Sequence, residues 1–137
     1  MSVKKELPVT KKQATEEVDG WLDYKGVRRR KRESNKEYIE QLIEGVEDGY
    51  LSVDEDHNIH FELAQAMGND NDITKLVFKP KMKVKDYHPH LKNVKPGDSD
   101  GRMMAYICGL TGQNSGIITQ LDTEDLTIAT NIAVFFF

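Results

Sequence analysis

The chain has 137 residues, of which 38% are hydrophobic and 31% are charged, so it holds enough apolar material for one modest core in a single small domain. No apolar run approaches the ~20 residues that a membrane-spanning helix needs, and we expect no signal peptide. The single cysteine, Cys108, excludes a disulfide within this sequence and a zinc site built from several thiolates.

The net charge of −4 conceals four blocks of alternating sign. Residues 1–40 carry a net charge of +3, residues 41–72 carry −9, residues 73–97 carry +6 and residues 98–137 carry −4. Alternating blocks are typical of a chain that binds a charged partner or further copies of itself.

Residues 1–17 contain few large apolar residues, and we expect an extended or flexible basic arm over residues 1–33 and a single α+β domain over residues 34–137. A small apolar cluster around Trp21 could dock on another surface. A basic patch follows it, and we expect this patch to be exposed because adjacent cations repel one another. The patch consists of Arg28, Arg29, Arg30, Lys31 and Arg32.

A helix is predicted over residues 34–48. Ser34 and Glu37 have the spacing of a capping box, apolar residues recur every three or four positions, and Gly49 is a plausible stop.

Strands are then predicted at residues 50–53, 59–65 and 73–79, and the last two form the best hairpin of a small antiparallel meander.

Residues 82–97 read as a loop or a short helical turn, because Pro89 and Pro96 interrupt them. Three helices are predicted after this loop, with N-caps at Asp98 or Ser99, at Asn114 or Ser115, and at Asp122 or Thr123. The expected fold is therefore α+β: a small antiparallel sheet, one preceding helix, three C-terminal helices and a mobile basic arm.

Two clusters suggest a metal site. Asp54, Asp56 and Asn58 match the opening of an EF-hand loop, but Ile59 and Gln65 stand where that loop needs Gly and Glu, which favours a polar turn.

The second cluster, His88 and His90 near Asp86, has no accompanying ligand motif and reads as a loop. Cys108 lies in an apolar helical stretch, as a core cysteine does. No phosphate-binding or nucleophile motif is present. We therefore expect no enzyme activity, no metal and no cofactor.

Two further patterns leave alternatives open. The basic patch with Trp21 and Tyr24 nearby suggests a small nucleic-acid-binding regulator, although the acidic chain, and residues 41–72 above all, would repel phosphates. The C-terminal Phe135, Phe136 and Phe137 either close the core or form an interface with another chain.

The C-terminal half carries an ordered series of motifs. A strand at residues 73–80 ends in Lys-Pro, a helix at residues 103–108 leads into Gly-Leu-Thr-Gly at residues 109–112, a Leu-Asp-Thr-Glu-Asp-Leu step follows at residues 121–126, and an apolar helix runs to Phe137. Over about residues 59–137 this order resembles the tail-assembly chaperones of contractile-tailed, Mu-like bacteriophages. Residues 1–50 have no counterpart in that resemblance.

The resemblance implies a non-enzymatic protein of the host cytoplasm that binds and solubilises the tape-measure protein, or another phage tail protein, during virion morphogenesis. We expect no membrane partner, and a homo-oligomer is an open alternative. A phage virion structural or connector protein is the first alternative, and the nucleic-acid-binding regulator is the second. A helix-in-groove mode would use adaptable apolar side chains. The side chains expected to bind the partner are Met103, Met104, Ile107, Ile132, Phe135 and Phe136.

Overall fold

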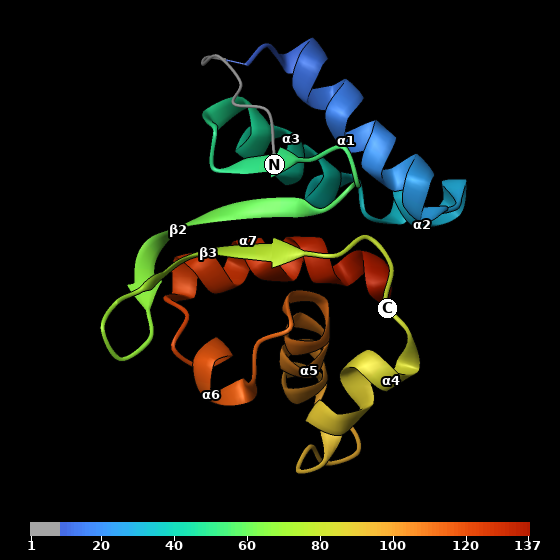
Figure 1. Ribbon diagram of the computed structural model, residues 1–137. Coiled ribbons are helices and arrows are strands. Elements are labelled where there is room, and N and C mark those ends of the chain that lie inside the picture. The colour runs from blue at the N-terminus through green and yellow to red at the C-terminus, as the bar shows by residue number, and fades with distance from the viewer. Residues whose placement is uncertain (1–8) are drawn as a thin grey trace.

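The computed structural model describes residues 9–137 and confirms the α+β class, with helices packed around a three-stranded antiparallel sheet (Figure 1). In chain order the elements are α1 (Lys11–Lys25), α2 (Arg29–Ser34), α3 (Lys36–Asp48), β1 (Leu51–Val53), β2 (Ile59–Met67), β3 (Ile73–Phe78), α4 (Val84–Tyr87), the 3₁₀ helix η1 (His88–Leu91), α5 (Ser99–Thr111), α6 (Ser115–Ile118), α7 (Thr123–Ala133) and the 3₁₀ helix η2 (Val134–Phe136). None of the helices among the described residues is long and apolar enough to cross a membrane.

The expectation of an extended arm is wrong for residues 9–33, which form α1 and α2; residues 1–8 of that arm lie outside the described residues. Thr10 caps α1 in a reciprocal capping box with Gln13. The buried residues of α1 follow helical spacing and pack on α3 and β1. They are Ala14, Val18, Trp21 and Leu22. The apolar stripe is sparse, so composition alone hides it.

Helix α3 begins two residues later than predicted. Ser34 donates its hydroxyl to the carbonyl of Arg30 in the last turn of α2, so the predicted capping box with Glu37 is wrong. The predicted stop is confirmed, because Gly49 ends α3 with a φ of 87°, a left-handed conformation that favours glycine. The fold therefore has α1 and α2 before α3, where one preceding helix was expected.

The sheet has the order β1-β2-β3, and both pairs are antiparallel, as predicted. Phe61 of β2 faces Leu51 on one side and Leu76 on the other, and all three side chains are buried. The register between β2 and β3 shifts between Glu62 and Met67. This irregularity leaves backbone amides of β2 free to bond outside the sheet.

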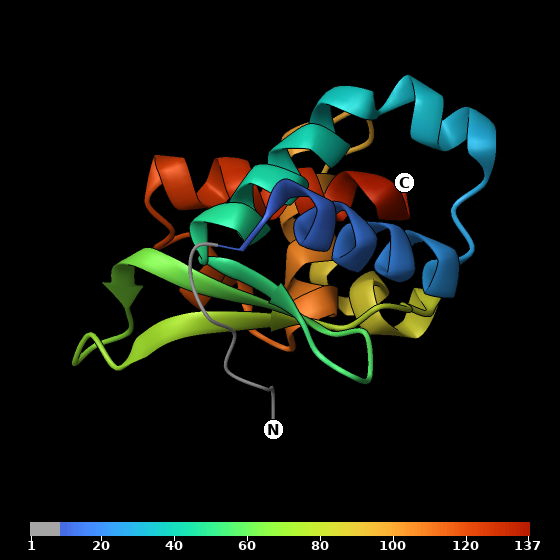
Figure 2. The ribbon, with the colours of Figure 1, turned by 90° about the horizontal axis from the view of Figure 1, so that it is seen from above.

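The three predicted C-terminal helices are confirmed, with side-chain caps from Asp98, Asn114 and Asp122. Helices α1 and α3 lie above the sheet in Figure 1, α4, α5 and α6 lie below it, and α7 runs between the two groups. Seen from above in Figure 2, the end of the chain lies near α1 and α2, far from the β2–β3 turn. Helices from the start of the described chain and its last residues therefore meet on one side of the domain.

Candidate functional site

The structure corrects half of the predicted partner-binding set. Ile107 and Ile132 are fully buried and Phe135 is 1% exposed, so these three side chains belong to the core. Their helices α5 and α7 pack on each other, and α7 also packs on α3. An apolar helical stripe has the same sequence pattern whether it faces the core or a partner.

The other three predicted residues lie on two separate surfaces. Met103 and Met104 are half-buried and line an open groove of about 400 Å³ between the start of α5 and α7. Phe136 lines a different cleft. The remaining residues of the groove, here called the methionine groove, are Ser99, Asp100, Leu126, Thr130 and Phe137.

The second surface is a cleft of about 790 Å³, here called the basic cleft. Segments that are distant in the sequence meet in it: the α1–α2 corner, the segment after β3, α4, α5 and η2. Its cationic lining residues are Lys25, Arg28, Arg30, Lys31 and Lys81. Its other lining residues are Gly26, Val27, Met82, Val84, Tyr87, Tyr106, Phe135 and Phe136. The cleft therefore combines positive charge with aromatic walls.

The structure divides the predicted basic patch into two groups. Arg28, Arg30 and Lys31 line the basic cleft. Arg29 lies 3.9 Å from Glu33 on the solvent side of α2. Arg32 donates to Asp23 at 2.7 Å and to the carbonyl of Val27 at 2.8 Å, which closes the turn between α1 and α2. Arg28 and Arg30 are therefore exposed to a ligand in the cleft. Arg32 holds the α1–α2 turn, whereas Arg29 makes only a weak surface pair.

Lys31 connects α2 to the end of the described chain. Its ammonium donates to the carbonyl of Phe135 at 3.0 Å and to a main-chain oxygen of Phe137 at 2.5 Å. Burial lowers the pKa of Lys31, partly offset by Tyr106. This lysine therefore fixes η2 against α2 and sets the position of the Phe136 ring in the cleft.

Lys25 is the cation whose charge the cleft disfavours most. Its ammonium is 3.4 Å from the centroid of the Phe136 ring, a cation–π contact. Burial, followed by the positive charges of Lys31 and Lys81, lowers its pKa from 10.5 to about 8. The folded protein thus holds Lys25 partly neutral at mildly alkaline pH and would hold it charged beside an anion.

The aromatic walls are built by close packing of α4 on α5. The rings of Tyr87 and Tyr106 lie 4.4 Å apart, and the ring of Phe137 meets Tyr106 edge to face at 4.6 Å. Gly109 of α5 permits this approach, because a Cβ there would lie 2.9 Å from the carbonyl oxygen of Asp86. The rim is extended by Lys81, whose ammonium is 4.7 Å from the centroid of the Tyr24 ring.

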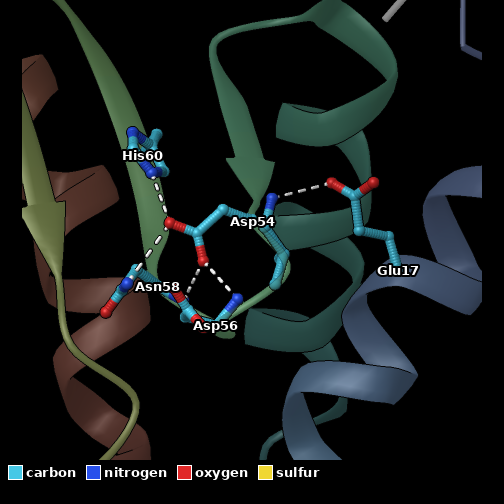
Figure 3. Close-up of polar contacts among 6 residues, drawn as sticks. Glu17, Asp54, Asp56, Asn58 and His60 are labelled. Carbon is cyan, nitrogen blue, oxygen red and sulfur yellow. Dashed lines mark hydrogen bonds and ion pairs between the residues drawn. The ribbon is translucent and has the colours of Figure 1, made fainter. Parts of the chain in front are cut away.

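The predicted calcium-like segment forms a tight polar turn between β1 and β2 (Figure 3). The Asp54 carboxylate accepts the backbone amides of Asp56 and Asn58 at 2.9 Å and contacts Nε2 of His60 at 2.8 Å. Burial opposes its charge, but the hydrogen bonds, first from His60 and then from Asn58 and Asp56, lower its pKa to about 2. The side chain of Glu17 joins the turn to α1 by accepting the amide of Val53 at 2.9 Å (Figure 3).

The buried carboxylate of Asp125 holds the irregular part of β2. It is 1% exposed and accepts the backbone amides of Ala64 and Gln65, each at 3.0 Å. These amides lie where the ladder with β3 shifts register. The Leu-Asp-Thr-Glu-Asp-Leu step at residues 121–126 thus has two structural functions. Asp122 caps α7, and Asp125 accepts the hydrogen bonds of the two unpaired backbone amides of β2.

Neither of the two clusters considered as metal sites gathers a ligand set among the described residues. His88 and His90 lie in η1, and within residues 9–137 no three His, Cys, Asp or Glu side chains are arranged to hold a metal ion. Cys108 is fully buried, as expected for a core cysteine, and burial raises the pKa of its thiol.

No family model, curated protein or solved structure matches this chain. Sequence reasoning named Arg28, Lys31 and Phe136 separately and missed Lys25, Lys81 and Tyr106, because these residues come together only through the packing of α4, α5 and η2.

Proposed function

We propose that this protein is a non-enzymatic phage tail-assembly chaperone that binds an apolar segment of the tape-measure protein. The family role comes from the resemblance of residues 59–137, and the methionine groove supplies the binding surface. The structural observation that supports it is that Met103, Met104, Leu126 and Phe137 line one groove, with Phe137 exposed at its side.

The chemistry of this groove suits a partner that changes along its length. A tape-measure helix offers successive, non-identical apolar segments, and methionine adapts its unbranched side chain to different shapes. Phe137, which is 52% exposed, gives a large apolar surface at one side of the groove. Ser99, Asp100 and Thr130 add polar groups to the lining, which suits the polar side of an amphipathic helix.

Co-expression with a tape-measure fragment tests the proposal. We expect the fragment to be soluble with the native protein and insoluble with either single variant, Met103→Asp or Met104→Asp, because a buried carboxylate would oppose the apolar contact. Ala66→Asp is the matched control, since Ala66 is exposed on β2 and lines neither surface. A fragment that stays insoluble with the native protein contradicts the proposal.

The protein content of purified phage particles separates the chaperone from the structural alternative. A chaperone acts before the tail is complete, so it is expected to be missing from finished particles. Its stoichiometric presence there would instead identify a virion structural or connector protein.

A further inference from the structure

The basic cleft is a separate surface from the methionine groove, and the two share no lining residue. We propose that it binds an acidic segment of a partner protein that also carries apolar side chains. In this arrangement the carboxylates lie against Lys25, Arg28 and Arg30, and the apolar side chains lie on Tyr87 and Tyr106. The inference goes beyond the proposed function, because it does not depend on what binds the methionine groove.

The first argument is the imbalance of charge in the cleft. Five cationic side chains line it, and none of the described residues that line it is acidic. In the part of the chain that the structure describes, no ion pair involves Lys25, Arg28 or Arg30, whereas Arg29 and Arg32 of the same run each have an acidic neighbour. Cations that converge without acids raise the local potential and attract an anion.

The second argument is the state of Lys25. Three side chains face its ammonium: Lys31 from α2, Lys81 from the segment after β3, and Phe136 from η2. The other polar groups that line the cleft are Arg28, Arg30, Tyr87 and Tyr106. Burial and two like charges disfavour its charged form. A bound carboxylate would reverse that balance, so at mildly alkaline pH the protein should take up a proton when an anion binds.

The third argument is the composition of the walls. Tyr87, Tyr106 and Phe136 give a partly aromatic surface next to the cations. A volume of about 790 Å³ lies within the ~300–1,000 Å³ range of ligand pockets and accommodates a short run of side chains. An acidic segment with Leu or Phe between its carboxylates complements both features at once.

Nucleic acid fits this surface less well. A polynucleotide is bound by cations that follow its backbone over many phosphates. Here the cations converge in one cleft, and the block at residues 41–72 carries a net charge of −9.

A second copy of this chain is also a poorer occupant. An exposed acidic feature of residues 41–72 is the β2–β3 turn with Asp70 and Asp72, and its neighbours Asn69 and Asn71 are polar and exposed. That turn would pair with the cations but leave the aromatic walls uncovered.

Fluorescence anisotropy with three probes tests the inference on the full chain. The probes are a labelled peptide in which Glu alternates with Leu and Phe, the same peptide with Lys in place of Glu, and a single-stranded oligonucleotide. We expect the Glu peptide to bind, and Arg28→Glu or Arg30→Glu to weaken it about tenfold. Arg29→Glu is the matched control, because it changes the net charge equally from the next position but lies outside the cleft.

Each other outcome overturns the inference. An equal effect of Arg28→Glu and Arg29→Glu would show that only net charge matters. Equal binding of the Lys peptide would show that only apolar contact matters. Tighter binding of the oligonucleotide, or self-association that Arg28→Glu abolishes, would assign the cleft to nucleic acid or to a second copy.

The pH dependence of binding provides a second readout. The affinity for the Glu peptide is expected to fall as the pH rises through about 8, because Lys25 then loses the proton that the carboxylate favours. Lys25→Met should remove this step. A step that persists in Lys25→Met would place the titrating group elsewhere and overturn the role given to Lys25.

Discussion

The rings of Trp21 and Phe135 meet edge to face, with their centroids 5.8 Å apart and their planes at 89°. Both side chains are 1% exposed. This contact joins α1 to the end of the described chain. It shows that the C-terminal phenylalanines do not all have the same role, core or interface. Phe135 closes the core, Phe136 lines the basic cleft, and Phe137 lies partly exposed beside the methionine groove.

The three phenylalanines should therefore differ in their effect on stability. Phe135→Ala is expected to lower the free energy of unfolding by about 3–5 kcal/mol, because it leaves a cavity against Trp21. Phe137→Ala should cost about 1 kcal/mol or less, since the ring is 52% exposed. Urea denaturation followed by Trp21 fluorescence measures both, and equal losses would contradict the assignment.

Asp125 is expected to matter more for stability than Asp122, although the two lie in the same motif. Asp125→Ala leaves the amides of Ala64 and Gln65 without an acceptor and should cost about 2–4 kcal/mol. Asp122→Ala removes only a helix cap and should cost about 1 kcal/mol. Thermal unfolding of the two variants tests the order, and the reverse order would contradict the buried role of Asp125.

The Asp54 turn should make the protein sensitive to acid. The pKa of Asp54 falls from 3.8 to about 2 on folding, so its contribution is present above pH 3.8 and is lost as the pH falls toward 2. With a side chain only 13% exposed, that contribution is about 2 kcal/mol. Asp54→Asn should lose this part of the pH dependence of unfolding, whereas Asp56→Asn, on an exposed side chain of the same turn, should retain it.

Lys25 should make the free energy of unfolding depend on pH in the alkaline range. Its pKa is about 8 in the folded protein and 10.5 in the unfolded chain, so between these values the unfolded chain binds more protons and stability rises with pH. Because the ammonium is only partly buried, solvent screening reduces the effect to about 1–2 kcal/mol. Unfolding free energies of the native protein and Lys25→Met, measured across this window, should converge as the pH rises. A constant difference would contradict the shifted pKa.

The approach of α4 to α5 depends on Gly109. Gly109→Ala would place a Cβ 2.9 Å from both the Asp86 carbonyl oxygen and the Met82 sulfur, and should cost about 1–3 kcal/mol. It should also weaken Glu-peptide binding, because α4 carries Tyr87 of the cleft. Gly20→Ala is the control: nothing lies within 4 Å of its Cβ, so it should stabilise α1 by about 0.5–1 kcal/mol.

Local signals were enough to predict much of the fold. The strands, the hairpin of β2 and β3, the stop at Gly49 and the three capped C-terminal helices each depend on residues close together in sequence. Helix α1 escaped prediction because its apolar stripe is sparse, although Thr10 and Gln13 have the spacing of a capping box. Ser34 was misassigned because its hydroxyl bonds backward to Arg30 within α2.

The sequence by itself determined the α+β class, the charge blocks of alternating sign and the apolar C-terminal helix. Only the tertiary structure decided which apolar residues are core and which cations converge. Ile107 and Met103 lie on the same helix, yet one is fully buried and the other lines a groove. Lys25, Lys31 and Lys81 share one cleft because α1, α2 and the segment after β3 pack around Phe136, and such contacts between distant segments leave no local pattern in the sequence.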